Sequence, residues 1–373
     1  MPRIAILFEY PSLLGGERSL LAGIERIGSE FAFLAIAPPV GRLAEALHAA
    51  GIGIVPSPLF DAEGRKQPRE LVLEDLAALV ASHHIDHLHG NSLAMGRLTG
   101  MLGERVAIPR TAHLRDIIKL SGRAVADLNC NTRLFAVSEA TRLYHIHQGI
   151  DSARVTTLYN GVDIDRFQPQ PRDWALRHEL EIPENAFVTL TIGQIGLRKG
   201  WDVLAQAMAI LAPRRPDLYS LFVGERYSGK QETIDYEQSF RTVLNDAMPG
   251  RVRFLGYRDD IPRLFAAADL LIHPAREEPF GRVLLEAAAA GCPIIATDVG
   301  GTREMLGETA HIIPPGDPEQ LAAAIEALAA DPNQRRTLSQ AARARIAINF
   351  NADQSAHELS KWLSVNKSPV YRP

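Results

Sequence analysis

Residues 269–305 read DLLIHPAREEPFGRVLLEAAAAGCPIIATDVGGTREM, and this stretch decides the expected fold. The apolar run 270–274 closes on a proline, which predicts a buried strand. A helix is expected from near Phe280 to Gly291, because glycine readily adopts the left-handed conformation that ends a helix and a proline soon follows. The next apolar run, 293–297, predicts a second strand. Strand, helix and strand in this order are typical of a parallel α/β sheet.

The same alternation of short apolar runs and longer helical patterns extends along the whole chain. In the first half the expected strands are 3–9, 31–37, 52–55, 85–89, 109–113 and 133–137. In the second half they are 187–193, 219–224, 252–256, 270–274, 293–297 and 310–313. Helical stretches separate them, among them 71–82, 202–212 and 282–290, and the tail 319–365 also has a helical pattern. The sequence therefore predicts an α/β protein with two Rossmann-like domains.

The domain division follows from length and from a polar linker. A chain of 373 residues exceeds the size at which one hydrophobic core usually stops growing. The boundary is expected within 160–186, which holds three prolines and many polar residues. We therefore predict domains at 1–168 and 169–348, with a C-terminal helix and tail at 349–373 that packs back on the first domain.

Composition excludes several classes of protein. There are 40 Lys plus Arg and 44 Asp plus Glu, and a formal net charge of −4 gives no general attraction to nucleic acid. Two cysteines do not make a disulfide framework, so a reducing, cytoplasmic compartment is expected. No stretch approaches the ~20 apolar residues of a membrane helix. Contact with a membrane would therefore be peripheral, at its inner face.

Two glutamates on the deciding stretch suggest a site for a nucleotide sugar. Glu278 precedes the expected helix and Glu286 lies eight residues later, which corresponds to about 12 Å along a helix axis. Each carboxylate could accept hydrogen bonds from the hydroxyls of one sugar ring, while the N–H groups of the helix start could hold a phosphate. The residues of that helix start are Phe280, Gly281, Arg282 and Val283. An ordinary amphipathic helix with acidic residues near its N-terminus explains the spacing equally well.

The residue types in this stretch are more informative than the spacing of the two glutamates. EPFGRVLLEAAAAGCPIIATDVGGTREM resembles the Glu-x7-Glu signature of the family 4 retaining glycosyltransferases, with the Gly-Gly-x-x-Glu segment that follows it. Further matching segments are GGER at 15–18, AVSEATR at 136–142, NGVD at 160–163, IGQIGLRKGWDVLAQAM at 192–208, LFVGE at 221–225 and VRFLGYRDDIPRLFAAADLLIHP at 252–274. The resemblance implies a GT-B fold, with two facing domains and a cleft between them. The first domain would then serve the acceptor and the second the nucleotide-sugar donor.

The resemblance assigns roles in the second half of the chain. It implies that Glu286 binds the ribose hydroxyls and that Glu278 binds the transferred sugar near the reacting face. Arg198 and Lys199 would stabilise the diphosphate as it leaves, although a basic pair alone is more typical of a solvated turn. Many family members carry arginine directly after the strand glycine, here Gly193, but this chain has Gln194. Whether Gln194 or Arg198 contacts the diphosphate stays open.

Candidates in the first half depend more heavily on the resemblance. The Gly-Gly loop at Gly16 could approach an anion, but an ordinary strand-to-helix turn explains it as well. In the family this loop covers the diphosphate and the reacting sugar. The family usually also has a histidine after the strand 109–113 that contacts the donor sugar near the scissile bond, and the resemblance implies this role for His113. Glu17 and Arg115 are assigned to the acceptor side by their position.

Other polar patterns offer alternative sites. The histidines at 83, 84, 87, 89, 145 and 147 lack an HExxH or CxxC context, so no metal site is predicted, and His89 could instead line the cleft. Asp163-Ile164-Asp165 is interpreted as part of the linker, with a turn at Asn160-Gly161. If Arg115, Lys119 and Arg123 shared one helix face, they could meet anionic lipid or a phosphorylated acceptor, although a solvated face is the simpler explanation.

The predicted reaction is transfer of a sugar from a nucleoside diphosphate to an acceptor, with retention of configuration. The acceptor, a glycan, a lipid-linked glycan or a small molecule of polysaccharide or glycolipid biosynthesis, is not defined by the sequence. No cofactor is expected, because protein cations and a helix terminus can stabilise the diphosphate. A nucleotide-sugar epimerase, a phosphorylase and a non-catalytic nucleotide-sugar-binding partner are the alternatives. Gln194 mildly favours the last of these, whereas Lys199, Glu278 and Glu286 oppose it.

Overall fold

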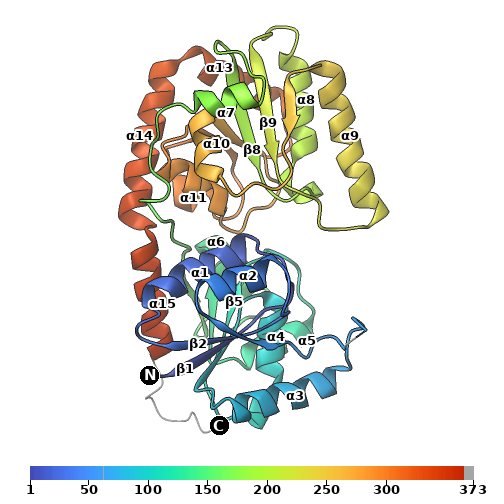
Figure 1. Cartoon of the computed structure of the whole chain (residues 1–373), viewed down its shortest axis with the longest axis vertical. Helices are drawn as coiled ribbons and strands as arrows, with labels where there is room; N and C mark the ends of the chain where they lie inside the picture. The colour runs from blue at the N-terminus through green and yellow to red at the C-terminus, as the bar shows by residue number, and fades with distance from the viewer. Residues whose placement is uncertain (62, 365–373) are drawn as a thin grey trace. The chain divides into compact units, whose positions relative to one another are not determined.

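The computed structural model describes residues 1–61 and 63–364, which form two compact units (Figure 1). The first unit runs to Gly161 and takes in the C-terminal segment from Ala352, and the second spans Val162–Asn351. The first boundary between the units thus lies between Gly161 and Val162, seven residues before the predicted boundary of 168/169. The reason is local: the Val162 N–H donates to the Phe350 carbonyl (2.9 Å), which ties the start of the linker to the end of the second unit. The part of the predicted tail beyond 364 lies outside the described residues.

The first unit contains a parallel seven-stranded sheet in the order β3-β2-β1-β4-β5-β6-β7. Its strands are β1 (Arg3–Leu7), β2 (Ala32–Ala37), β3 (Gly53–Pro56), β4 (His87–Gly90), β5 (Arg110–Leu114), β6 (Arg133–Ala136) and β7 (Val155–Thr157). The six predicted strands are confirmed. The seventh escaped prediction because β7 has only three residues, two of them threonines, and so carries almost no apolar pattern.

Helices cover both faces of this sheet. They are α1 (Gly15–Ile27), α2 (Arg42–Ala49), α3 (Arg69–Ser82), α4 (Leu93–Met101), α5 (Gly122–Asn129), α6 (Glu139–His147) and α15 (Ala352–Ser364), with a short η1 (Gly103–Arg105). Alternate residues of β1 point to opposite faces. Ile4 and Ile6 pack with α1, α2 and α15, whereas Ala5 and Leu7 pack with α3 and α4. The C-terminal helix therefore completes the core of the first unit.

The second unit contains a parallel six-stranded sheet in the order β10-β9-β8-β11-β12-β13. Its strands are β8 (Phe187–Ile192), β9 (Leu218–Val223), β10 (Val252–Phe254), β11 (Leu270–His273), β12 (Ile294–Thr297) and β13 (His311–Ile313). Its helices are α7 (Trp174–Glu179), α8 (Trp201–Leu211), α9 (Gln231–Ala247), α10 (Ile261–Ala267), α11 (Arg282–Ala289), α12 (Thr302–Leu306), α13 (Pro318–Ala330) and α14 (Pro332–Asn349), with η2 (Leu197–Lys199). All six predicted strands are present.

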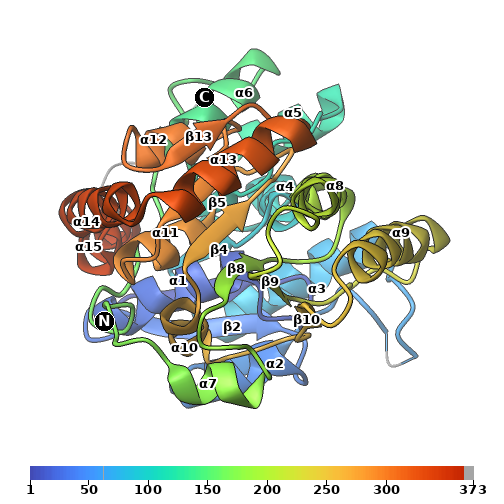
Figure 2. The same ribbon diagram turned by 90° about the horizontal axis from the view of Figure 1, so that it is seen from above.

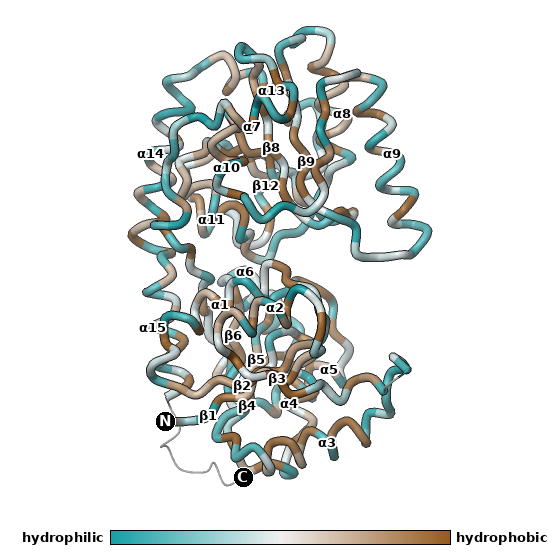
Figure 3. Tube along the Cα trace, in the orientation of Figure 1, coloured by the Kyte–Doolittle hydropathy of each residue, from teal (hydrophilic) through white to brown (hydrophobic). Residues whose placement is uncertain are grey.

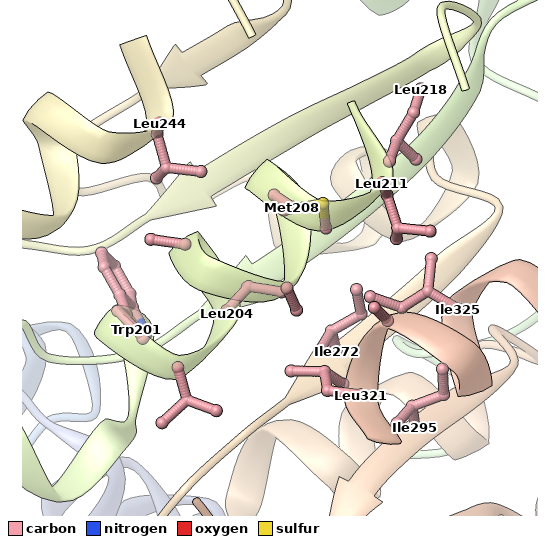
Figure 4. Packing of buried hydrophobic residues seen from close by; sticks show 14 of the residues in the cluster. Trp201, Leu204, Met208, Leu211, Leu218, Leu244, Ile272, Ile295, Leu321 and Ile325 are labelled. Atoms are coloured by element: carbon pink, nitrogen blue, oxygen red, sulfur yellow. The ribbon is translucent and has the colours of Figure 1, made fainter. Parts of the chain in front are cut away.

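A large apolar cluster fixes α8, α9 and α13 on one face of this sheet (Figures 1 and 2). Trp201, 1% exposed, belongs to this cluster and has ring contacts to Phe222 (5.4 Å) and Phe240 (5.6 Å). Met208 and Leu211 continue the same helix face toward α13 (Figure 4). Hydrophobic colouring gathers accordingly in the strands and along the inner faces of the helices (Figure 3). Burial of this cluster holds the start of α8, and with it the preceding loop, against the sheet.

The strand order marks where a ligand would bind in each unit. In an open parallel sheet, ligands bind beyond the carboxyl ends of the strands where the order reverses direction. That reversal lies between β1 and β4 in the first unit and between β8 and β11 in the second. The segments that follow these strands are therefore the candidate binding loops. Among the described residues, no helix combines the length and the apolarity needed to cross a bilayer.

Candidate active site

Three side chains converge where the strand order reverses in the second unit. Lys199, at the end of η2 after β8, places its Nζ 2.5 Å from Oε2 of Glu278, in the loop after β11. His273, the last residue of β11, donates from Nε2 to the same oxygen across 2.7 Å. All three side chains are largely buried, with exposed fractions of 11% for Lys199, 7% for Glu278 and 3% for His273. Sequence reasoning identified the first two but missed His273.

The buried cluster is an ion pair supported by a neutral histidine. Burial alone would raise the pKa of the Glu278 carboxyl, but the Lys199 charge and the His273 hydrogen bond together hold it well below its usual range. Burial and the charge of Lys199 lower the pKa of His273. At neutral pH, Glu278 is therefore a carboxylate and His273 an uncharged donor. The other Glu278 oxygen, Oε1, accepts no hydrogen bond within 1–61 and 63–364 and remains available for a ligand.

Backbone contacts hold the two loops of this cluster together. The N–H groups of Arg276 and Glu277 both donate to the Arg198 carbonyl, at 2.7 and 3.3 Å. The Arg276 guanidinium forms a forked pair with the Asp202 carboxylate, at 2.7 and 2.6 Å. Gly200 lies so close to the Pro274 carbonyl that a Cβ there would be 1.9 Å from its oxygen. Lys199 is thus fixed beside Glu278 by main-chain packing and not by its side chain alone.

The start of α11 carries the second group of predicted donor-binding residues. Gly281 has φ +88°, a conformation that favours glycine, so α11 begins at Arg282 rather than near Phe280. The Phe280 ring is buried against Phe350 (5.6 Å), so only its backbone could meet a ligand. Arg282 pairs with Glu286 one turn later (2.6 Å), which holds the Glu286 carboxylate near the helix start. In this first turn the N–H groups of Leu284 and Leu285 both donate to the Gly281 carbonyl, at 3.0 and 3.3 Å, whereas no main-chain acceptor is found for the Val283 N–H among the described residues.

The loop after β8 contains both Gln194 and Arg198, the two candidates for contact with the diphosphate. The Lys199 side chain lies over Gly193, where a Cβ would be 3.6 Å from its Cδ and Cε atoms. Gln194 is half-buried and Arg198 is exposed. Arg198 contributes its backbone carbonyl to the loop contacts described above, and its charge helps to lower the pKa values of Lys199, His273 and Glu278. That one of these two side chains contacts a phosphate stays a prediction.

Of the residues predicted in the first unit, one stabilises a helix end and others lie together at the carboxyl ends of the strands. Glu17 accepts a hydrogen bond from the Leu14 N–H (3.1 Å), so it caps α1. Arg115 donates to Oδ1 of Asn91, at 2.9 Å from Nη2, and its side chain covers Gly16, where a Cβ would be 2.8 Å from Cδ. Arg115, Gly16 and the unpredicted Asn91 therefore come together beyond β1, β4 and β5. His113 is buried at the end of β5.

Two alternative patterns fare differently in the structure. The shared basic helix face is wrong, because 115–121 is irregular and α5 begins only at Gly122. Asp163-Ile164-Asp165 does lie in the linker, where the Asp163 carboxylate accepts hydrogen bonds from the N–H groups of Asp165 and Arg166. The turn falls at 164–166 and not at Asn160-Gly161, where it was predicted. Within the described part of the chain, no group of three or more His, Cys, Asp or Glu side chains is arranged to hold a metal ion.

Comparison with known proteins agrees with this arrangement. The model for glycosyl transferases group 1 matches residues 172–345, and that for glycosyltransferase family 4 matches 19–166. A D-inositol 3-phosphate glycosyltransferase of Salinispora tropica is 30% identical over 86% of this chain and 73% of its own length. One from Streptomyces scabiei is 30% identical over 73% of this chain and 66% of its own length. The crystal structure of Anabaena HepE with UDP-glucose has a TM-score of 0.85 at 25% identity, covering 97% and 99% of the two chains.

The chain belongs to the glycosyl transferases group 1 family and is a glycosyltransferase of the GT-B fold class. Two Rossmann-like units with parallel sheets are the architecture of that class. Transfer of a sugar from a nucleotide sugar is accordingly its class of reaction.

Proposed function

We propose that this enzyme is a retaining glycosyltransferase that takes its sugar from a nucleoside diphosphate, with UDP-glucose as the first donor to test. The observation that carries the proposal is the buried pair of Lys199 and Glu278 where the second sheet reverses its strand order. A UDP-glucose complex of a 25% identical protein of the same fold supports this choice of donor.

In this proposal the diphosphate lies between Lys199 and the amide groups that open α11. The phosphate oxygens gain negative charge as the glycosidic bond breaks, so fixed positive groups stabilise the transition state more than the bound substrate. Gly193 leaves room for the Lys199 side chain and Gly281 leaves room for Glu278, so both glycines help to place the groups that would meet the ligand. Arg198 adds a second cation beside Lys199.

The sugar and ribose ends of the donor would each meet a carboxylate. Glu278 offers its unused Oε1 to hydroxyls of the transferred sugar, and Glu286 binds the ribose hydroxyls after exchanging part of its contact with Arg282. Since Glu278 is already held by Lys199 and His273, it serves better as a fixed acceptor of hydrogen bonds than as a nucleophile. Retention would then follow from a short-lived oxocarbenium-like state, with the donor phosphate taking the proton of the acceptor hydroxyl.

The acceptor would be met by the first unit, near the cluster of Gly16, Asn91 and Arg115, with His113 as a further substrate contact. The relatives named as D-inositol 3-phosphate glycosyltransferases support a polyol or sugar hydroxyl, phosphorylated or not, as the acceptor. A glycan or lipid-linked glycan would offer the same kind of accepting hydroxyl. The segment 115–121 is irregular and partly exposed, so a larger acceptor of this kind could contact it. A lipid-linked acceptor would require only a peripheral meeting with a membrane.

The test is a panel of nucleotide sugars in a thermal-shift assay, followed by turnover of the best ligand. A ligand that binds the folded state raises its melting temperature, by an amount that grows with concentration over Kd. We expect one nucleoside diphosphate sugar to stand out, and the anomeric proton of the first product formed to show the donor's configuration by NMR. Inversion of that centre would refute the retaining route, and the absence of any shift across the panel would refute the donor site.

A further inference from the structure

A line of polar side chains crosses the otherwise apolar face of the first sheet. His87 and His89 project from β4, and Thr111 and His113 project from the same face of β5, since His89 pairs with Thr111 in register. Apolar residues surround them, including Phe135 stacked on His89 (6.0 Å) and Leu359 of α15. Each of the four side chains is at most 3% exposed. Polar groups buried so deeply are costly unless hydrogen bonds connect them.

Hydrogen bonds do connect the four side chains, in one unbranched chain. His87 Nε2 lies 2.8 Å from Thr111 Oγ1, and the same oxygen lies 2.8 Å from His89 Nδ1. His89 Nε2 then lies 2.8 Å from His113 Nδ1. Burial lowers the pKa of His87 to about 4 and holds the pKa values of His89 and His113 well below the ordinary value of a histidine. All three imidazoles are therefore neutral at physiological pH, and each has one N–H and one bare nitrogen.

Three proton arrangements are compatible with these contacts. In the first, His87 donates to Thr111, Thr111 to His89, and His89 to His113. In the second, every donor is reversed, and His87 must carry its proton on Nδ1. In the third, both His87 and His89 donate to Thr111, whose own hydroxyl hydrogen then finds no acceptor among the described residues.

One buried atom distinguishes the first two arrangements. His87 Nδ1 is fully buried and has no hydrogen-bond partner within 1–61 and 63–364. The first arrangement leaves a bare lone pair there, whereas the second buries an unpaired N–H. Orphaned N–H groups are the rarer of the two in folded proteins, so the first arrangement is favoured.

We propose that His87, Thr111 and His89 are positioning residues that fix His113 as the tautomer with its proton on Nε2, pointing a hydrogen-bond donor from the end of β5. That this donor meets a substrate oxygen rests on the proposed function. The tautomer itself does not. A histidine whose Nδ1 accepts a hydrogen bond must carry its proton on Nε2 while neutral.

The experiment compares Thr111→Val with Thr111→Ser. Valine matches the shape of threonine but cannot bridge the two histidines, whereas serine keeps the hydroxyl. Long-range proton–nitrogen NMR spectra of protein labelled with [15N]-histidine distinguish the two tautomers. The His113 signals are identified by their loss in His113→Gln. We expect the Nε2–H form of His113 in the parent and in Thr111→Ser, and a mixture of tautomers in Thr111→Val.

Kinetics with the best donor of the thermal-shift panel give the second readout. Thr111→Val should lower kcat about tenfold, the loss expected from one neutral hydrogen bond, with KM for the donor within about twofold. Thr111→Ser should restore kcat to near the parent value. An Nδ1–H form in the parent, an unchanged tautomer in Thr111→Val, or an unchanged kcat beside a changed tautomer would overturn the proposal. A parent without turnover would count against the proposed function only, because the NMR measurement still reads the tautomer.

Discussion

The coupling between Lys199 and Glu278 can be measured with a double-mutant cycle. Removing one partner of a buried ion pair leaves the other charge uncompensated and costs about 3 kcal/mol or more. The exposed fractions of 11% and 7% place this pair in that regime. Lys199→Met and Glu278→Gln should therefore each lower the free energy of unfolding of the second unit by about 3 kcal/mol. For a unit spanning Val162–Asn351, this corresponds to a fall in Tm of ~6–12 °C.

The double variant should lose less than the sum of the two single variants. Lys199→Met/Glu278→Gln leaves no unpaired charge, so we expect a coupling of about 2 kcal/mol in urea or thermal unfolding. Lys230→Met and Glu184→Gln are matched controls in the same unit, because both side chains are exposed, and each should change stability by less than ~0.5 kcal/mol. Additive losses in the double variant would refute the ion pair as described.

Three further predictions concern the second unit. The folded-state pKa of Glu278 is lowered from its ordinary 4.5, so the contribution of its carboxylate to the free energy of unfolding is complete above that pH and is lost on acidification. The stability difference between the parent and Glu278→Gln should therefore narrow from about pH 5 toward pH 3 in urea titrations. A constant difference would contradict the lowered pKa. Gly200→Ala, at φ +66° against the Pro274 carbonyl, should cost more than about 2 kcal/mol in unfolding, whereas Gly196→Ala, in extended backbone with open space, should cost under ~0.5; equal effects would exclude the close approach. Trp201→Ala should lower stability by about 3–5 kcal/mol, against under ~1 for the half-exposed Trp174→Ala, as measured by thermal unfolding.

Much of the fold could be predicted because apolar runs in parallel sheets are nearly continuous. All twelve predicted strands are present, within one or two residues at their ends. β7 and the short helix α7 within the linker were missed, since each is too short to show a period. The helix face at 115–123 failed because regular spacing of charges does not make a helix without an apolar stripe.

The candidate site was also predicted only in part. Lys199 and Glu278 were predicted from motifs, and the structure brings them together. His273, the partner of Glu278, looked like the end of an ordinary strand. The chain from His87 to His113 could not be foreseen, since it depends on the register of β4 against β5. Sequence patterns locate residues on elements, but they do not define which side chains meet across a sheet.

Isothermal titration of UDP-glucose into the parent and two variants tests the central claim most directly. If Lys199 and Glu286 hold the two ends of a nucleoside diphosphate, Lys199→Ala and Glu286→Ala should each weaken Kd by about tenfold or more, the loss of one charge-assisted hydrogen bond. Lys230→Ala, on the exposed start of α9, should bind like the parent. Unchanged affinity in both Lys199→Ala and Glu286→Ala would contradict a donor site at β8, β11 and α11.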